Sequence, residues 1–410
     1  MPHRPIEDTL ERPAAVPAQP HRRTIYIACP WTPVGGGMYK VADYLIQAQG
    51  AGADERSAAL RPLDTRGAGS AAASMLVLAQ ALARLVRGRL GGRLAGVHVN
   101  MAERLSLVRK SAIVVACKAL GVPVVLHLHA AQLHRAYPDF PAWGRALVRW
   151  VFSLPRTCIV LGQASADFVT RDLGVPPERV EVVINGVPAP TLPRRAPGAG
   201  RRILFVGNLS ERKGVSDLLR ALAQPRMEGI PFEATFAGGG DVEGYRAMAA
   251  RMGLAEHVHF AGWADASTLA QLLSQADVLV LPSYDEGLPL AILEALAQGV
   301  AVVCTPVGEI PHVLTDGHNA CFVQAGDAAS IADGLARVLG DERLRRTLEH
   351  NGQALYRQQF SLTRFYENIA RIHRRHFGIA GAPASAVAEG SAEPLHTPRE
   401  TAAQAVREQP

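Results

Sequence analysis

The sequence of 410 residues has little of what membrane-spanning and disulfide-rich proteins have in abundance. Its longest apolar stretch, residues 111–131, is interrupted by Lys118, Gly121 and Pro123, so it predicts a helix, a turn and a buried strand rather than a membrane span. Five cysteines occur and none belongs to a C-x-x-C pair, which argues against a disulfide framework and a structural zinc site. The first 23 residues lack the apolar stretch of a signal peptide. We therefore expect a cytoplasmic protein, with any membrane contact limited to the periphery of the inner face of the plasma membrane.

Three ligand-binding motifs are also missing. No Asp-x-Asp occurs, the pair with which many transferases hold Mg²⁺ or Mn²⁺ against a diphosphate. The glycines 35–37 do not extend to G-x-G-x-x-G because position 40 is Lys, which removes the fingerprint of a dehydrogenase. The segment 206–214 is not a phosphate loop of the G-x-x-x-x-G-K-[ST] type, because Arg212 replaces the second Gly and Gly214 replaces the Ser or Thr.

The composition is that of a globular protein with an uneven charge. Hydrophobic residues make up 48% and charged residues 20% of the chain, which is enough to form a core. Residues 1–200 hold 24 Lys and Arg against 13 Asp and Glu, whereas the remainder holds 19 against 24. A basic first half suits anionic lipid, nucleic acid or a phosphorylated substrate, and composition does not choose among them.

Short β-branched runs alternate with stretches of helical length through most of the chain. Runs without polar alternation are typical of parallel strands buried on both faces, and two such series predict two doubly wound, Rossmann-like α/β domains. The expected strands are Thr24–Cys29, Leu94–Val99, Pro123–His129, Thr157–Leu161 and Val180–Ile184 in the first domain, and Arg202–Val206, Phe232–Ala237, His257–Phe260, Val278–Leu281 and Val300–Cys304 in the second.

Composition also marks the domain boundary. Pro188–Gly200 is rich in Pro and Gly and has no periodicity, as expected of a linker, and the residues after Ala380 have no apolar pattern. The resulting plan is a disordered extension 1–23, a first domain 24–190, a linker 191–200, a second domain 201–360, a helix 361–379 that returns to the first domain, and a disordered tail 380–410.

The segment 277–306 places two carboxylates around the start of a helix. Glu286 lies in the loop after a strand, Pro289 precedes a strongly helical run, and Glu294 lies inside that run among apolar residues. A carboxylate in such surroundings needs a partner. The helix N-terminus between them offers free N–H groups and a positive dipole end for an anion. Two hydroxyl-binding carboxylates beside a phosphate site match a nucleotide sugar.

With Glu286 and Glu294 in EGLPLAILE matching an E-x7-E motif, the sequence resembles the retaining GT-B glycosyltransferases of family four. The resemblance covers most of the chain. Other segments similar to family motifs are VGNLSERKG (Val206–Gly214), a phosphate-contacting segment; TPVGEIPHVL (Thr305–Leu314), the segment after the following strand; NGV (Asn185–Val187), an end-of-domain signature; and PVGGG (Pro33–Gly37), a glycine loop.

The resemblance implies a GT-B fold whose interdomain cleft transfers a sugar from a UDP- or GDP-linked donor with retention of configuration, without a metal or other cofactor. In the family a Lys at the position of Lys213 binds the diphosphate, together with an Arg at the position that here is Asn208. Either Arg212 supplies the missing charge or binding depends more on Lys213. The implied catalytic residues are His129 and Glu286, and the implied donor-binding residues are Gly36, Gly37, Asn208, Arg212, Lys213, Gly287, Leu288 and Glu294.

His127 and His129 lie at the end of the strand VPVVLHLHA, and both are on the same face of that strand. Ligands bind at the carboxyl ends of parallel strands, so His129 is expected at the site and His127 behind it. His129 matches the family histidine near the reacting sugar, although Ala130 follows it where the family usually has Gly or Asp.

Basic residues of the first half gather beside Trp143, Trp150 and Phe152. Such helices suit an anionic membrane surface, and no nucleic-acid recognition motif accompanies them. The expected partners are a nucleotide sugar, a lipid-linked saccharide acceptor of polysaccharide assembly and an anionic membrane, but no nucleic acid. Solvated helix faces are the alternative for these cations, which are Arg84, Arg87, Arg89, Arg93, Arg104, Arg109, Lys110, Lys118, Arg145, Arg149 and Arg156.

Two other classes of function stay open at this point. One is an enzyme of different chemistry, a nucleotide-sugar epimerase on the same fold or a dehydrogenase on a doubly wound one. The other is a non-enzymatic basic protein that binds membrane or nucleic acid. Hydrolysis of a donor without acceptor separates a transferase from a scaffold, and the identity of the product separates it from an epimerase.

Overall fold

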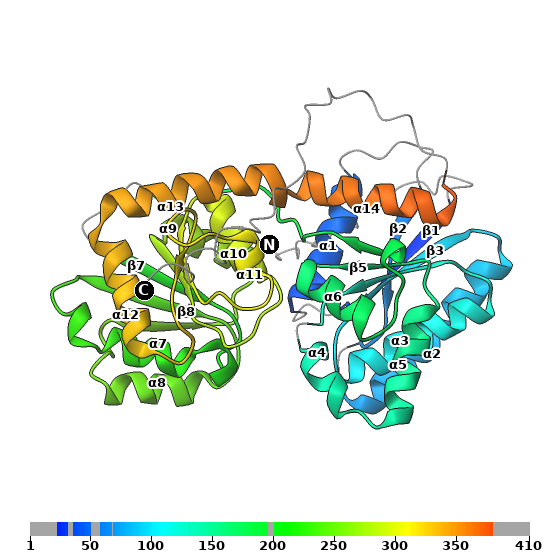
Figure 1. The fold of residues 1–410 in the computed structure, drawn as a ribbon, viewed down its shortest axis with the longest axis horizontal. Helices are drawn as coiled ribbons and strands as arrows, with labels where there is room; N and C mark the ends of the chain where they lie inside the picture. The colour runs from blue at the N-terminus through cyan, green and yellow to red at the C-terminus, as the bar shows by residue number, and fades with distance from the viewer. Residues whose placement is uncertain are drawn as a thin grey trace, which may run out of the picture.

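The computed structural model describes residues 23–31, 36–50, 58–67, 69–130, 132–195 and 201–379. The expected extension 1–23, apart from Arg23, the tail 380–410 and the linker residues 196–200 lie outside the described residues. Two parallel six-stranded sheets, each covered by helices, stand side by side (Figure 1). The expectation of two doubly wound α/β domains is confirmed.

The first sheet has the strand order β2-β1-β3-β4-β5-β6. Its strands are β1 (Thr24–Cys29), β2 (Ala59–Asp64), β3 (Leu94–Met101), β4 (Val124–Leu128), β5 (Thr157–Val160) and β6 (Val180–Val182). Its helices are α1 (Gly37–Gly50), α2 (Ala71–Leu90), α3 (Leu105–Ala119), α4 (Leu133–Ala136), α5 (Ala142–Ser153) and α6 (Gln163–Arg171). Besides the short strand Cys321–Phe322 of the second sheet, only β2 was absent from the expected strands. It is an edge strand whose Arg61 and Pro62 are exposed, and edge positions tolerate proline.

The second sheet has the order β12-β11-β10-β7-β8-β9. Its strands are β7 (Arg201–Val206), β8 (Phe232–Ala237), β9 (Val258–Gly262), β10 (Val278–Leu281), β11 (Ala301–Cys304) and β12 (Cys321–Phe322). Its helices are α7 (Val215–Leu222), α8 (Val242–Arg251), α9 (Ala266–Gln275), α10 (Leu290–Gln298), α11 (Ile310–Val313), α12 (Ala328–Gly340) and α13 (Glu342–Leu355). The bounds of α10 agree with the helical run in the sequence, which ends at Gly299 in the left-handed conformation (φ 74°).

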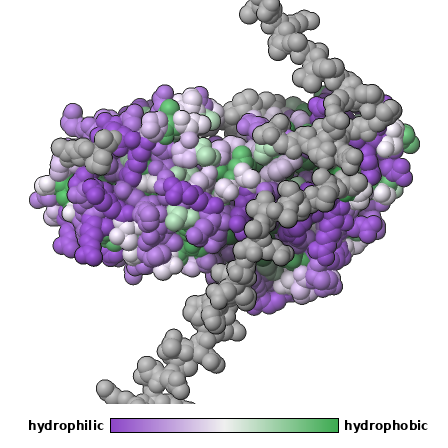
Figure 2. Space-filling view, turned by 90° about the horizontal axis from the view of Figure 1, so that it is seen from above, coloured by the Kyte–Doolittle hydropathy of each residue, from purple (hydrophilic) through white to green (hydrophobic). Residues whose placement is uncertain are grey.

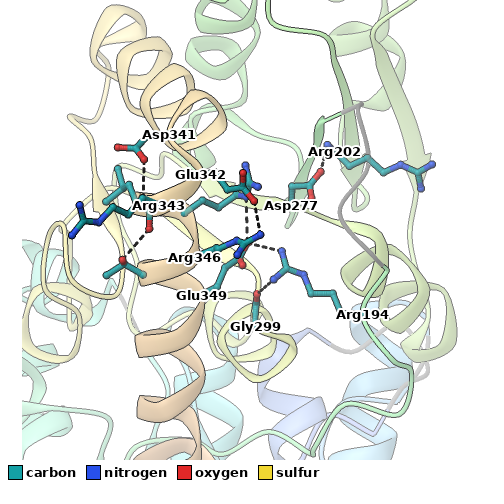
Figure 3. Close-up of polar contacts among 12 residues, drawn as sticks. Arg194, Arg202, Asp277, Gly299, Asp341, Glu342, Arg343, Arg346 and Glu349 are labelled. Atoms are coloured by element: carbon teal, nitrogen blue, oxygen red, sulfur yellow. Dashed lines mark hydrogen bonds and ion pairs between the residues drawn. The ribbon is translucent and has the colours of Figure 1, made fainter.

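The described part of the linker is fastened to the second domain (Figure 3). Arg194 donates to the carbonyl oxygen of Gly299, at the end of α10, and to Glu349 on α13 at 2.7 Å. Asp277 accepts a hydrogen bond from the backbone of Arg202, at the start of β7, at 2.9 Å. Arg194 and Arg202 are therefore both held by residues of the second domain.

The two chain segments that cross between the domains contact each other. The backbone N–H of Val187 donates to Phe360 and the N–H of Leu362 donates back to Val187, both at 3.0 Å. A Cβ on Gly186 would lie 2.5 Å from the Cβ of Phe365, so this close approach requires glycine. The chain then continues as α14 (Leu362–Phe377), which follows α13 along one edge of both domains (Figure 1).

Helix α14 completes the first domain. Its Phe365, Ile369, Ile372 and Phe377 are buried in a cluster with residues of β1 and α1. A Cβ on Gly96 would lie 2.3 Å from the ring of Phe377, which shows how closely the helix lies on β3. Seen from the side of α13 and α14, the surface is mostly hydrophilic (Figure 2). The apolar side of α14 thus packs against the first sheet.

Three buried histidines connect α14 to the sheet. His98 Nδ1 on β3 lies 2.8 Å from Nε2 of His373 on α14, and His98 Nε2 lies 3.3 Å from Nδ1 of His127 on β4. All three are at most 3% exposed. Burial lowers the pKa of His98 to about 3 and the pKa values of His127 and His373 well below 6.5. The three rings are therefore neutral in the folded protein.

This predicts a loss of stability in mild acid. Below pH 6.5 the histidines of the unfolded chain take up protons that the folded chain does not accept, so unfolding becomes more favourable as pH falls. Each residue contributes at most about 1.4 kcal/mol per pH unit. The melting temperature should fall as the pH is lowered from 7 to 5.5. His373→Asn should make the melting temperature less dependent on pH. His350→Asn, at an exposed position, should leave this dependence unchanged. A melting temperature independent of pH over this range would contradict the assignment.

Candidate active site

The loops after the strands of both sheets meet where the two domains face each other, at the start of α10. The first residues of α1 touch this helix across the gap, because a Cβ on Gly37 would lie 3.5 Å from Cδ1 of Leu290. Gly36 and Gly37 are both exposed, so their backbone is accessible to a ligand. Pro33–Gly35 of the glycine loop lie outside the described residues. Gly36, Gly37 and the free N–H groups of α10 therefore border one space, and both groups favour an anion.

Glu286 lies in the loop before α10 and is 7% exposed. Its Oε1 binds the ammonium group of Lys213, and Arg212 Nη1 lies 4.0 Å from its Oε2. Arg212 also donates to the carbonyl oxygen of Asp285 at 2.6 Å. A Cβ on Gly214, which is left-handed (φ 69°), would lie 2.2 Å from the carbonyl oxygen of Pro282, so glycine lets the two loops meet. Both cations expected at the diphosphate thus converge on the first carboxylate.

Glu294, inside α10, takes its partners from the other domain. Its Oε1 accepts from Nζ of Lys40 at 2.8 Å and from the hydroxyl of Tyr44 at 3.3 Å. Lys40 and Tyr44 are one turn apart on α1 and share a face. The expectation that this carboxylate needs a partner is confirmed. The sequence reasoning missed Lys40, although its place three residues after Gly37 was a signal.

His129 follows the end of β4, at the mouth of the first domain. Its Nε2 lies 2.8 Å from Oδ1 of Asn100 on β3. An amide oxygen only accepts, so Nε2 carries the hydrogen and Nδ1 is left as an acceptor. Burial lowers the pKa of His129 to about 3, so the ring stays neutral. His127 lies behind it, with ring centroids 4.0 Å apart. Asn100 was missed because it lies within an apolar run, between Val99 and Met101.

The remaining expected residues differ in whether a ligand can reach their side chain or only their backbone. The backbone of Gly207 is next to Lys213, since a Cβ there would lie 3.6 Å from Cε of the lysine. Asn208 follows and is exposed. The side chain of Leu288 packs in the core of the second domain at 5% exposed, so only its backbone can serve a ligand, as with Gly287.

A cavity of about 500 Å³ lies beside Glu286 and is lined by both domains. The first domain contributes residues of β4, α4 and α6, among them His134 and Ser165, and the second contributes Glu286, Gly287 and His312. In the part of the chain that the structure describes, no group of three or more His, Cys, Asp or Glu is placed to hold a metal ion. The site thus consists of carboxylates, lysines, a neutral histidine and helix N–H groups.

Two family models match this chain. The model of glycosyltransferase family 4 matches residues 56–189, and that of the glycosyl transferases group 1 matches residues 194–355. The chain belongs to the family 4 glycosyltransferases. It is therefore a glycosyltransferase, as the resemblance of its motifs implied.

Curated relatives and solved structures agree with this assignment. The phosphatidyl-myo-inositol mannosyltransferase of Mycobacterium leprae is 34% identical over 42% of this chain and 48% of its own length. The putative colanic acid biosynthesis glycosyltransferase WcaL of Salmonella typhimurium is 29% identical over 47% and 52%. The matches thus span about half of each relative.

The solved structures establish the fold. The sucrose-phosphate synthase of Thermosynechococcus elongatus superposes with a TM-score of 0.72 at 17% identity, covering 88% of this chain and all of its own. HepE of Anabaena, in complex with UDP and glucose, superposes with a TM-score of 0.67 at 18% identity, covering 86% and 99%. The expected GT-B fold is confirmed.

Proposed function

We propose that this glycosyltransferase takes a sugar from a nucleotide-diphosphate donor and transfers it with retention of configuration. The observation that carries the proposal is the pair Glu286 and Glu294, each nearly buried, each bound to a lysine, on either side of the N-terminus of α10. The complexes of HepE with UDP-glucose and with UDP support a donor of this class, UDP- or GDP-linked.

The diphosphate lies at the start of α10, against the backbone of Gly36, Gly37, Gly287 and Leu288. Negative charge develops there as the sugar leaves, and Lys213, with Arg212 beside it, stabilises that charge. Glu294 binds the ribose hydroxyls, which take the place of Lys40. The released ammonium group then faces the phosphates and supplies the charge that Asn208 lacks.

The sugar lies between Glu286 and His129. Glu286 accepts from its hydroxyls, and the free Nδ1 of neutral His129 accepts from a further hydroxyl near the anomeric carbon. A double displacement needs a carboxylate on the far side of the bond from the leaving group, and the residues assigned here supply none. We therefore propose departure of the diphosphate and attack by the acceptor on the same face.

Substitutions of the two carboxylates should change different kinetic constants. Glu286→Gln should chiefly lower kcat, because Glu286 acts on the reacting sugar, and Glu294→Ala should chiefly raise the KM of the donor, because Glu294 holds the ribose. Initial rates against donor concentration measure both effects, and the anomeric configuration of the product, read by NMR, tests retention. Values of kcat/KM close to wild type in both variants would remove the proposed roles.

Activity should survive an excess of EDTA. The proposed site neutralises the diphosphate with Lys213, Arg212 and helix N–H groups, and the sequence has no Asp-x-Asp. Transfer rates before and after chelation provide the measurement. Loss of all activity, restored by Mg²⁺ or Mn²⁺, would mean that a metal ion holds the donor.

A lipid-linked saccharide is the proposed acceptor. One relative is named for phosphatidyl-myo-inositol, a lipid, and another for the biosynthesis of colanic acid, and these names are in line with a lipid-borne acceptor and with polysaccharide assembly respectively. The face of the first domain that carries α2, α3 and α5 suits an anionic membrane. It exposes large apolar residues at 48% to 82%, which are Met75, Leu76, Leu90, Leu105, Val108, Trp143, Leu147 and Trp150.

The cations of this face differ from the expected set in one residue. Arg84, Arg87 and Arg149 are exposed, but Lys110 is 1% exposed and bonds to Thr65 inside the first domain. Its position on α3 turns it toward the sheet, so it takes no part in the surface. No helix in the described ranges is long and apolar enough to cross a membrane.

Binding to vesicles should therefore depend on anionic lipid. Each engaged cation contributes about 1 kcal/mol, so co-sedimentation should rise with anionic lipid and fall as salt is raised from about 50 to about 500 mM. Trp143→Ser should weaken binding, whereas Trp263→Ser, at an exposed tryptophan of the second domain, should leave it unchanged. Equal binding to neutral and anionic vesicles, or none to either, would favour a soluble acceptor.

A further inference from the structure

A carboxylate of the second domain caps a helix of the first. Glu309 lies between β11 and α11 and is only 2% exposed. Its Oε1 accepts from the backbone N–H and the hydroxyl of Ser165, both at 2.9 Å, and its Oε2 accepts from the N–H of Ala164 at 3.4 Å. These groups form the first turn of α6, where free N–H groups and the helix dipole favour a negative charge. The contact joins the two domains beside the cavity.

The first domain has a space shaped for this carboxylate. A Cβ on Gly162 would lie 2.2 Å from Oε2 of Glu309. The backbone of Gly162 is extended, with φ −178°, which any residue adopts. Glycine is therefore needed here for space alone, and the three atoms nearest to such a Cβ all belong to the side chain of Glu309.

Glu309 is also fixed to the loop of the proposed sugar site. Its backbone N–H donates to the carbonyl oxygen of Gly287 at 3.1 Å. The preceding Gly308 is left-handed (φ 60°), and a Cβ there would lie 1.9 Å from the carbonyl oxygen of Glu286, so only glycine permits this approach. One residue thus holds the Glu286 loop by its backbone and the other domain by its side chain.

We propose that Glu309 is a positioning residue that latches the two domains in the reactive arrangement. The inference rests on the proposed function, since it concerns the geometry of sugar transfer. Capping of α6 fixes the wall of the cavity that contains Ser165 and His134 against Glu286. The latch is polar, so it exchanges its bonds for water when the domains part, without exposing either core. Substrates enter and leave by that opening.

The test uses a variant on each side of the contact. Glu309→Gln keeps the shape and removes the charge, and Gly162→Ala fills the space from the other domain. Each should lower kcat about 10- to 100-fold, the range expected when charged hydrogen bonds are lost. Binding of UDP or GDP, measured by calorimetry, should change less than about threefold, because the variants break the side-chain contact with α6, which carries none of the residues proposed to hold the nucleotide, and leave the backbone bond to Gly287 in place. The double variant should be no worse than either single one, because both break one contact.

A second readout does not depend on activity. Small-angle X-ray scattering of the ligand-free full chain should give a larger radius of gyration for both variants than for wild type. Glu243→Gln, with a side chain 80% exposed, and Gly340→Ala, with no atom within 4 Å of the added Cβ, are the matched controls and should behave as wild type. Ser165→Ala removes one donor only and serves if either main variant fails to fold.

The outcomes separate the latch from the proposed function. Wild-type kcat and radius of gyration in both variants would overturn the latch. So would a loss confined to Glu309→Gln, because Glu309 would then act within its own domain. A wild-type protein that binds neither UDP nor GDP would contradict the proposed donor instead, and scattering would still decide the latch.

Discussion

Two negative charges, one in the loop before helix α10 and one inside the helix, constrain the rest of the molecule. Glu286 and Glu294 have little contact with water, and removing one partner of a buried ion pair typically costs about 3–5 kcal/mol. Lys213 satisfies the first from within the second domain, and Lys40 satisfies the second from the first domain. The domains must therefore meet at this helix for Glu294 to be paired. A site that needs both domains is also one that substrate binding can reorganise.

The joints between the domains are of two kinds. Helix α14 is joined to the first sheet by apolar side chains and neutral histidines, and separating it would expose a core. The contacts across the cleft include an apolar one, in which Leu290 packs against the cluster of the first domain. The others are polar, among them Lys40 with Glu294, Glu309 with α6, and Arg135 with Asp285 at 3.5 Å. Arg135 is more than half exposed, and such pairs contribute little on their own. The crossing helix thus acts as the lasting connection and the cleft contacts as the exchangeable ones.

Much of the fold could be predicted because local signals agree with it. The segment Leu290–Gln298 has a proline before it, a glycine after it and a helical pattern between, and the helix has those bounds. The strand β2 was missed because Pro62 contradicts a strand everywhere but at an edge. Lys110 was placed on the surface because a single lysine does not show which side of its helix faces the sheet.

The candidate site could be predicted in part for the same reason. The pattern of apolar neighbours shows that Glu294 needs a partner, but a contact between positions 40 and 294 depends on how two domains dock. The same holds for Glu309, whose capped helix lies more than a hundred residues away. Asn100 sets the tautomer of His129 through the register of β3 and β4, which no local pattern records.

The most direct test is a crystal structure of the full chain with UDP or GDP. The account predicts the diphosphate at the N-terminus of α10 against Lys213, the ribose hydroxyls on Glu294, and Lys40 moved from that carboxylate toward the phosphates. A nucleotide bound elsewhere, or bound here with the pair of Lys40 and Glu294 intact, would contradict it.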